Sequence, residues 1–308
     1  MKYYFAPMEG ITLANFRRIH RACFPGADAY FAPFVVANQT FHFHKKEIRD
    51  LLPENNRDIP LIPQVLTNKP DQMLWACQEL MKFGYREINL NLGCPMPQVA
   101  KRGRGSGFLS DPELLDRFFD AVFEGLAGMD IRLSVKTRLG TVSPGEAYLL
   151  MKVYNRYPLH EIIIHPRLMK DLYKGSLHME VFREMAACSV NPVCYNGDLL
   201  SPEDVTQLLS AYPVDRIMIG RGLLRNPALI RQLQGQPPAA ISELKNYHDR
   251  LFDSYLEMLP DGRQAVTKMK EIWSFWHPFF FCTDRQLKAL RKSTWPDQYT
   301  AAVREILS

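Results

Sequence analysis

The chain has 308 residues, of which 46% are hydrophobic and 23% are charged, as is usual for a folded globular protein. No apolar run approaches the roughly 18 residues of a membrane span. The N-terminal sequence MKYYFAPMEG has no apolar stretch of the kind that secretory signals contain. These features exclude a disordered or membrane-spanning chain and predict a cytoplasmic protein. The net charge of +5 is too small to identify a partner.

The cysteines are scattered and form no C-x-x-C pair, so the spacing of zinc ribbons and iron–sulfur clusters is absent from the sequence. We therefore expect reduced thiols, no bound metal and no disulfide framework. The six cysteines are Cys23, Cys77, Cys94, Cys188, Cys194 and Cys282.

Short apolar runs typical of β-strands alternate with amphipathic helical segments through the first two-thirds of the chain. The expected strands are Lys2–Ala6, Ala29–Phe34, Leu61–Val65, Glu87–Leu92, Arg132–Val135, Glu161–Ile164, Pro192–Tyr195 and Arg216–Ile219. The clearest helices are Pro70–Phe83, Pro112–Leu126, Gly145–Tyr157 and Pro202–Ala211. Eight alternating strands predict a parallel sheet closed as a (β/α)8 barrel, although an open doubly wound sheet has the same alternation.

Polar residues at the ends of the strands favour the barrel. They are Pro7-Met8, Gln64, Asn91 with Cys94, Lys136 with Arg138, His165 with Arg167, Asn196-Gly197-Asp198 and Gly220-Arg221-Gly222. In a barrel, all carboxyl strand ends meet at one mouth, so these residues would converge on one ligand.

The pattern changes after the Pro237-Pro238 pair, where strands give way to helices expected at Ile241–Leu259, Arg263–Trp276 and Asp284–Leu307. A proline pair is a stiff link. We therefore predict a catalytic barrel over residues 1–238 and a small all-helical domain over residues 239–308.

The last two strand ends, Asn196-Gly-Asp and Gly220-Arg-Gly, combine glycines with an arginine near a helix start. Barrels commonly hold a nucleotide or flavin phosphate at this place. Lys136 and His165 could donate to an electron-rich ring beside it. Taken singly, such residues also occur in tight turns, on exposed surfaces and as satisfied structural histidines.

Cys94 differs from the other cysteines, which we interpret as core or incidental. It follows a strand directly, between Gly93 and Pro95, and basic residues at Lys101, Arg102 and Arg104 come soon after it. Basic surroundings lower the pKa of a thiol, so we expect Cys94 to exchange protons near neutral pH as a general acid.

Together these motifs resemble the dihydrouridine synthase family, which reduces uridine in tRNA with FMN and NADPH. The resemblance covers nearly the whole chain. It is carried in order by Ala6-Pro-Met8, Gly93-Cys-Pro95, Gly105-Ser-Gly-Phe-Leu109, Asp111-Pro112, Val135-Lys-Thr-Arg138, His165-Pro-Arg167, Tyr173, Gly175, Asn196-Gly-Asp198 and Ile219-Gly-Arg-Gly222.

The resemblance implies a mechanism in which hydride passes from FMN to C6 of uracil and Cys94 protonates C5, with NADPH or NADH as the reductant. Asn91 and Arg138 would orient a base flipped out of its stack. The partner would be tRNA or another structured RNA, and we expect a monomer. The FMN ligands would be Pro7, Met8, Gln64, Lys136, His165, Asn196, Asp198, Gly220 and Arg221.

RNA contacts are expected at the mouth and on the helical domain, since basic side chains bind phosphates and aromatic side chains stack on bases. The substrate-binding residues expected are Asn91, Lys101, Arg102, Arg138, Arg167, Lys288, Arg291 and Lys292. Trp273 and Trp276 fit a helical core better than a stacking surface. The chain departs from the family pattern at Leu168–Asp171 and at His178-Met179, both on the substrate side.

Two other functions share parts of this pattern. An FMN barrel that reduces a free pyrimidine, of the dihydroorotate or dihydropyrimidine dehydrogenase kind, has no need of Lys101, Arg102 and a helical appendage. A non-catalytic RNA-binding protein on the same barrel has no reason to keep Cys94, Lys136 and His165.

Overall fold

The computed structural model describes residues 1–276, 280 and 282–307, and its strands form one parallel sheet. The sheet order is β3-β5-β6-β7-β8-β9-β10-β1-β2-β4. The strands are β1 Lys2–Phe5, β2 Ala29–Phe31, β3 Val35–Val36, β4 Leu61–Ile62, β5 Gln64–Leu66, β6 Glu87–Leu92, β7 Arg132–Arg138, β8 Ile162–His165, β9 Val193–Tyr195 and β10 Arg216–Ile219.

The two ends of this sheet meet at Pro63, so the sheet closes into a barrel. Pro63 separates β4, which pairs with β2, from β5, which pairs with β6. The two pieces are one barrel strand that proline interrupts. The predicted (β/α)8 barrel is therefore confirmed, and the open doubly wound sheet is excluded.

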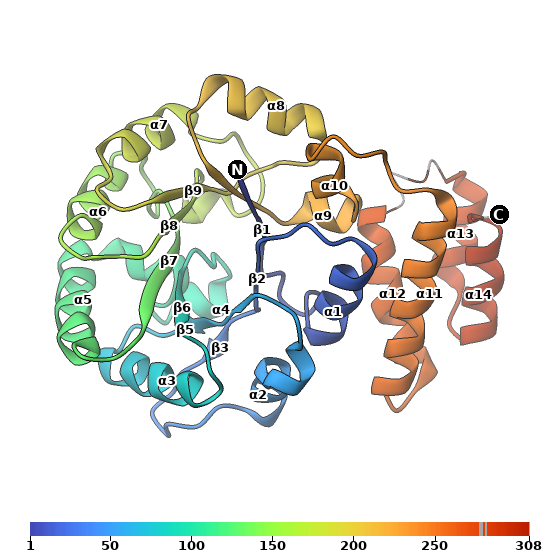
Figure 1. Cartoon of the computed structure of the whole chain (residues 1–308), viewed down its shortest axis with the longest axis horizontal. Helices are drawn as coiled ribbons and strands as arrows, with labels where there is room; N and C mark the ends of the chain where they lie inside the picture. The colour runs from blue at the N-terminus through green and yellow to red at the C-terminus, as the bar shows by residue number, and fades with distance from the viewer. Residues whose placement is uncertain (277–279, 281, 308) are drawn as a thin grey trace.

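Helices surround the barrel and continue into a helical region beside α1 and α9 (Figure 1). The barrel helices are α1 Ala14–Cys23, α2 Lys45–Leu51, α3 Pro70–Lys82, α4 Pro97–Ala100, α5 Pro112–Leu126, α6 Glu146–Tyr154, α7 Met179–Cys188, α8 Pro202–Ala211, α9 Arg221–Arg225 and α10 Leu229–Leu233. Short 3-10 turns lie at Pro53–Asn56, Gly105–Ser110 and Met169–Asp171. In the described part of the chain, α5 and α8 begin at a proline behind a capping side chain: Asp111 accepts from Leu114 N, and Ser201 accepts from Asp204 N.

The helical region consists of α11 Ile241–Met258, α12 Gly262–Trp276, α13 Asp284–Lys292 and α14 Pro296–Arg304. The single helix predicted over Asp284–Leu307 is wrong. Pro296 lacks the N–H that a helix interior needs, so it ends one helix and starts the next. No helix in the described part of the chain is long and apolar enough to cross a membrane.

The helical region shares one hydrophobic core with the barrel. Tyr247 of α11 is 1% exposed and contacts the rings of Phe16 and Phe24 beneath it. Trp273 and Trp276 are buried, as the core interpretation predicts. The predicted boundary at residue 238 falls in the connection between α10 and α11, but the shared core makes the helical region a brace of the barrel.

Strand alternation divides the barrel interior into an apolar side and a polar side. Successive residues of a strand face opposite sides of the sheet. An apolar cluster that includes Tyr4, Ile163 and Met218 fills one side of the interior. On β6, Ile88 and Leu90 instead pack outward, which turns Asn89 and Asn91 inward to hydrogen-bond with residues of the neighbouring strands. The sequence thus places a row of polar groups beneath the mouth.

Candidate active site

Two adjoining cavities open at the carboxyl ends of the strands, with volumes of about 110 Å³ and 380 Å³. The smaller lies at the ends of β9 and β10, and the larger lies above β5, β6 and β7. Five residues line both cavities, which makes them two ends of one mouth. The shared residues are Pro7, Met8, Lys136, His165 and Tyr173.

The mouth gathers all nine residues that the sequence assigns to FMN. Asn196, Asp198, Gly220 and Arg221 line the smaller cavity, Gln64 lines the larger one, and the other four line both. Cys94, Asn91 and Arg138 line the larger cavity as well. A cofactor in this mouth would thus lie next to the cysteine.

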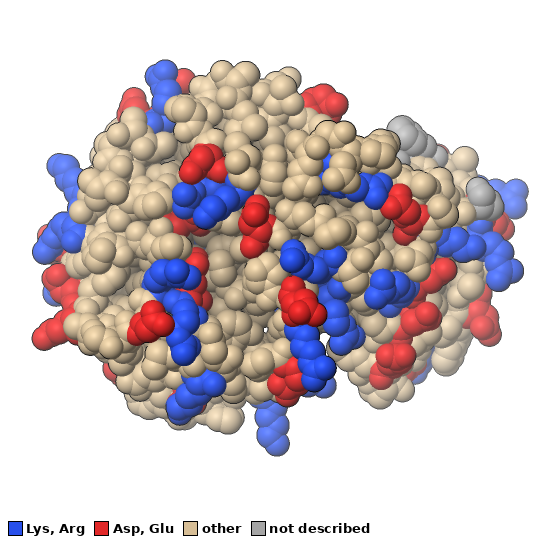
Figure 2. Space-filling model, in the orientation of Figure 1, with Lys and Arg blue, Asp and Glu red and all other residues tan. Residues whose placement is uncertain are grey.

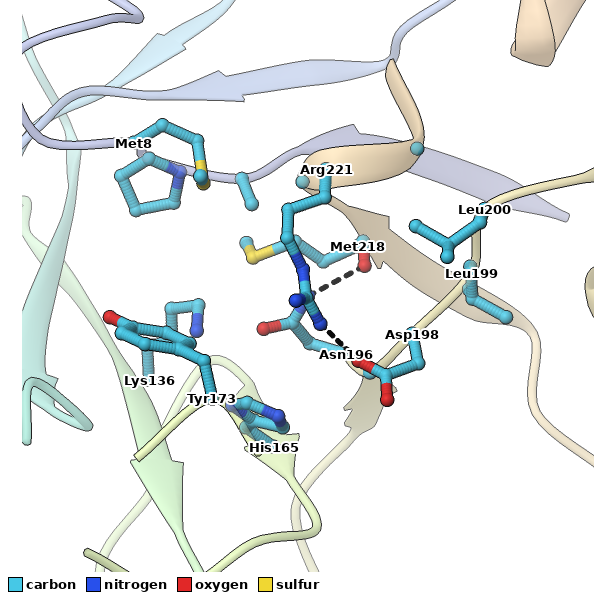
Figure 3. A pocket seen from close by; sticks show the side chains of 15 residues that line it. Met8, Lys136, His165, Tyr173, Asn196, Asp198, Leu199, Leu200, Met218 and Arg221 are labelled. Carbon is cyan, nitrogen blue, oxygen red and sulfur yellow. Dashed lines mark hydrogen bonds and ion pairs between the residues drawn. The ribbon is translucent and has the colours of Figure 1, made fainter. Parts of the chain in front are cut away.

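Lys136 carries a positive charge that no other described residue neutralises. Its ammonium has no hydrogen bond or ion pair within the described part of the chain, although Lys136 lines both cavities. Figure 3 shows its side chain in the smaller one. Burial, together with the charge of Arg138, lowers the pKa of Lys136 to about 8. A buried cation without a partner fits a ligand that brings electron-rich oxygen or nitrogen to this place.

The pKa of Lys136 predicts how FMN affinity depends on pH. An electron-rich ring binds better to the ammonium than to the neutral amine, so affinity should be flat from pH 7 to 7.5. Above about pH 8 it should fall, by up to tenfold per unit when one proton must be taken up. In the flavin-free protein, the pKa of Lys136 is lower than the 10.5 of the unfolded chain, so folding is opposed by the need to lose part of the proton or to bury the charge. The free energy of unfolding should therefore rise as the pH rises from about 8 towards 10.5.

Fluorescence titration of flavin-free protein with FMN measures this dependence. Lys136→Met should bind FMN more weakly at neutral pH and lose the fall above pH 8, whereas Lys136→Arg should keep its affinity to higher pH. Wild-type and Lys136→Met curves of the same shape would remove Lys136 from the cofactor site.

His165 is neutral and its proton can be placed. Burial lowers its pKa well below 6.5, and the nearby Arg138 and Lys136 act in the same direction. The guanidinium of Arg167 lies 3.0 Å from His165 Nε2. An arginine can only donate, so Nε2 accepts and Nδ1 carries the hydrogen. His165 therefore offers the mouth an N–H donor without a charge.

Asp198 joins two arginines at the smaller cavity. Arg167 donates to both Asp198 oxygens, at 2.9 and 2.5 Å, and Arg221 pairs with the same carboxylate (Figure 3). Although burial opposes it, the two arginines lower the pKa of Asp198. A carboxylate repels a phosphate, so Asp198 is placed to orient Arg221 rather than to bind phosphate itself.

Arg167, expected to bind substrate, is 3% exposed and lines neither cavity. Its guanidinium also donates to the carbonyl of Gly175, at 2.8 Å, so it holds Asp198, His165 and the following loop together. Gly222 likewise serves the fold, because a Cβ there would lie 2.0 Å from the Leu199 carbonyl oxygen. Glycine is therefore required at position 222 because the backbone of Leu199 packs against it.

The Cys94 loop is held from both sides. Asn91 Oδ1 accepts from the N–H groups of Gly93 and Cys94, at 3.1 and 2.9 Å. The Cys94 carbonyl accepts from the N–H and hydroxyl of Ser106, at 3.0 and 2.9 Å. Gly105 has φ +55°, and a Cβ there would lie 2.7 Å from that carbonyl oxygen. Gly105 and Ser106 therefore hold the backbone of Cys94 in place.

The expected lowering of the Cys94 pKa is wrong. Burial raises the pKa of this thiol, against the opposing effects of a Met96 backbone hydrogen bond and of Arg138. Lys101 and Arg102 are exposed and line neither cavity. The thiol is therefore held protonated, as a proton donor requires.

Arg138 is 1% exposed, and its guanidinium bonds to the carbonyls of Gly93 and Leu168, at 2.8 and 2.9 Å. The same guanidinium lies 5.3 Å from the ring centre of Tyr173, which is 52% exposed at the mouth. Arg138 thus fixes the cysteine loop while lining the larger cavity.

Two further features were missed by reading the sequence. Glu9 lines the larger cavity directly after Pro7-Met8, and its position at a strand end was an available signal. A separate groove of about 370 Å³ between α1, α2 and α11 is lined by Arg18, Lys46 and Arg49. Their side chains form no hydrogen bond or ion pair within the described residues. Lys46 and Arg49 lie on α2 and Arg18 lies on α1, so the sequence alone does not show that the three line one groove.

The basic residues expected on α13 are exposed: Lys288, Arg291 and Lys292. Figure 1 places α13 beyond α11 and α12 as seen from the barrel, so these residues lie outside the mouth. On the face shown in Figure 2, Lys and Arg are interspersed with Asp and Glu over the barrel. Exposure makes the α13 residues accessible to RNA but does not bring them to Cys94.

Comparison with known proteins agrees with this geometry. The family model described as dihydrouridine synthase (Dus) matches residues 4–277. A probable tRNA-dihydrouridine synthase of Staphylococcus aureus (strain Mu50 / ATCC 700699) is 29% identical over 265 residues, which cover 82% of this chain and 78% of that protein. Probable tRNA-dihydrouridine synthase 2 of Bacillus subtilis (strain 168) is 28% identical over 261 residues, with the same coverages.

Among solved structures, morphinone reductase superposes with a TM-score of 0.55 at 12% identity, covering 78% of this chain and 87% of that one. At this identity the likeness concerns the fold alone, and it agrees with the barrel described above. The family match extends over the barrel and into α12. The chain therefore belongs to the dihydrouridine synthase family.

Proposed function

We propose that the protein reduces the C5=C6 bond of uridine in tRNA to give 5,6-dihydrouridine, in the cytoplasm, with FMN as cofactor and NADPH or NADH as reductant. The observation that carries the proposal is the mouth itself. It collects the nine residues assigned to FMN, among them Lys136 with no charge partner in the described part of the chain, next to a protonated cysteine. The named relatives, tRNA-dihydrouridine synthases of two bacteria, support RNA as the substrate.

The residues of the mouth fit FMN. Arg221, 38% exposed and oriented by Asp198, would hold the phosphate, since arginine and phosphate form strong charge-assisted hydrogen bonds. Lys136, the neutral His165 and Gln64 would hold the ring system. When bound, FMN would supply the hydride that adds to C6 of uracil after its own reduction by the nicotinamide.

Cys94 would complete the reduction by giving its proton to C5. The hydride and the proton together supply the two hydrogen atoms, with two electrons, that saturate the double bond. Asn91 and Arg138 fix the loop so that the thiol faces the larger cavity. A uridine must leave its stack to enter this cavity, and single-stranded or looped RNA makes this easiest.

RNA docking on α13 gives a quantitative prediction. If Lys288, Arg291 and Lys292 contact phosphates, changing all three to Ala should lower RNA affinity. The slope of log affinity against log salt should shrink by about 0.7–0.9 per lost contact. Flavin content should stay constant, and Lys152→Ala on the barrel helix α6 serves as the exposed control.

A filter-binding salt series decides between surfaces. An unchanged slope in the α13 variant would shift RNA binding to the exposed Lys101 and Arg102 after the Cys94 loop, and to the groove of Arg18, Lys46 and Arg49. The same series on Arg18→Ala, Lys46→Ala, Arg49→Ala protein then tests that groove directly.

The function as a whole is tested with purified protein. It should carry noncovalent FMN, seen as a flavin absorbance spectrum, and should oxidise NADPH. Given tRNA that lacks dihydrouridine, it should form dihydrouridine detectable by mass spectrometry, whereas free uracil and uridine should not be reduced. Protein unable to bind added FMN would refute the proposal, and efficient reduction of a free pyrimidine would favour a dehydrogenase of the small-molecule kind.

A further inference from the structure

A row of hydrogen-bonded side chains crosses the polar side of the barrel interior and ends at the cysteine loop. Asn91 Nδ2 donates to Gln64 Oε1 at 2.7 Å, and Gln64 Nε2 donates to Asn89 Oδ1 at 2.7 Å. Asn89 Nδ2 then donates to Ser134 Oγ at 2.9 Å. The row joins three neighbouring strands, β5, β6 and β7. Gln64, Asn89 and Ser134 are 0% exposed, and Asn91 is 7% exposed.

The donor and acceptor of every bond in this row can be assigned by starting from the cysteine end. The backbone N–H groups of Gly93 and Cys94 can only donate, so Asn91 must turn its oxygen to them. Its NH₂ group then faces Gln64, which must turn its oxygen toward Asn91 and its NH₂ group toward Asn89. Asn89 is constrained in the same way, and each amide is satisfied only in this orientation.

Ser134 is suited to end the row because a hydroxyl can accept one hydrogen bond and donate another. It accepts from Asn89, and its hydroxyl lies near enough to the Glu87 carboxylate to affect that group's pKa. A residue able only to donate at position 134 would oppose the Asn89 NH₂ group. The row therefore begins at an oxygen that accepts from the cysteine loop and ends at a hydroxyl that accepts from Asn89.

Asn91 Oδ1 accepts from the Cys94 loop and Gln64 Oε1 accepts from Asn91, so the hydrogens not yet used by the two amides nearest the mouth are N–H hydrogens. Gln64 and Asn91 both line the larger cavity, and each NH₂ group has a second hydrogen beyond the one used. A cavity lined by fixed donors suits a ring edge that carries carbonyl oxygens, as uracil does.

We propose that Asn89 and Ser134, which line neither cavity, are positioning residues. Through Gln64 they fix the orientation of Asn91 and hence the Cys94 loop. This inference rests on the proposed function for its RNA readout. Asn89 and Ser134 touch no reacting group and act only through the hydrogen-bonded row.

The test compares three variants. Asn89→Leu has similar volume but no acceptor for Gln64. Dihydrouridine formation per bound flavin should fall about tenfold, as expected for the loss of a buried hydrogen bond, while flavin-limited NADPH oxidation should stay within about twofold. Asn89→Asp should restore much of the turnover, because its carboxyl oxygen still accepts from Gln64, while an ionised carboxylate cannot donate to Ser134 as the amide does. Ser134→Ala removes only the last acceptor and should lie between them.

A double-mutant comparison separates positioning from general loss of stability. If Asn89 acts through Asn91, adding Asn89→Leu to Asn91→Ala should reduce RNA turnover no further. Independent, additive losses would overturn the proposal, as would Asn89→Leu protein with wild-type turnover per flavin. If Asn89→Leu fails to fold, Ser134→Ala combined with Asn91→Ala gives the same comparison.

The rate at which iodoacetamide alkylates Cys94 is a second readout that needs no RNA. Asn89→Leu should change this rate severalfold, and Asn89→Asp should not. Failure of the proposed function would appear as wild-type protein that does not modify RNA, with the alkylation difference still present. Equal alkylation of all variants would show that the row does not position the cysteine.

Discussion

Replacing Cys94 with Ala should lower the rate of RNA reduction by on the order of 10²–10⁴-fold, the usual effect of removing a general acid. The thiol lines the larger cavity and burial keeps it protonated, so it can deliver a proton to a base there. FMN content and NADPH oxidation should be unchanged, because neither requires that proton. Single-turnover formation of dihydrouridine, followed by mass spectrometry, measures the effect.

Cys282→Ala is the matched control, since Cys282 is also a partly buried free thiol but lines neither cavity. It should reduce RNA at the wild-type rate. Cys94→Ser should resemble Cys94→Ala, because a hydroxyl is a much weaker acid than a thiol. Unimpaired turnover in Cys94→Ala protein would show that Cys94 is structural and that another group donates the proton.

Arg221→Ala should weaken FMN binding by roughly 10- to 100-fold, the range for a hydrogen bond to a charged group. The guanidinium is a partly exposed cation of the smaller cavity, and Asp198 holds it in place. Asp198 keeps its bonds to Arg167 in the variant, so the loop should remain folded. Equilibrium dialysis or flavin fluorescence gives the affinity.

Arg225→Ala, at the other end of α9, removes an equal charge from outside the mouth and should bind FMN normally. Riboflavin, which lacks the phosphate, should bind wild-type and Arg221→Ala protein with equal affinity. Arg221→Ala protein that retains full FMN affinity would place the phosphate elsewhere.

The barrel and its mouth could be predicted because each strand is recognisable from the order of its own residues. The run Glu87–Leu92 was predicted with its observed bounds, since alternating apolar and polar residues leave little choice of conformation. Residues at strand ends converge by topology, so Gln64, Lys136 and Arg221 could be grouped without knowing any distance. Pro296 gave an equally local signal for the break between α13 and α14.

Burial and pairing could not be predicted, because they depend on which distant segments pack together. The pKa of Cys94 is set mainly by desolvation, whereas Lys101 and Arg102, its basic neighbours in the sequence, are exposed and line neither cavity. Arg167 looks like a substrate ligand until Asp198 is found beside it. The amides of Asn89 and Gln64 likewise meet only across strands.

The central claim is that this chain makes dihydrouridine in RNA, and its most direct test is the dihydrouridine content of total cellular RNA with and without the gene. Mass spectrometry of RNA fragments should find at least one uridine, in tRNA, that is reduced only when the gene is present. Re-expression of the wild-type chain should restore that modification, and the Cys94→Ala chain should not. Identical dihydrouridine maps in the two strains would contradict the account.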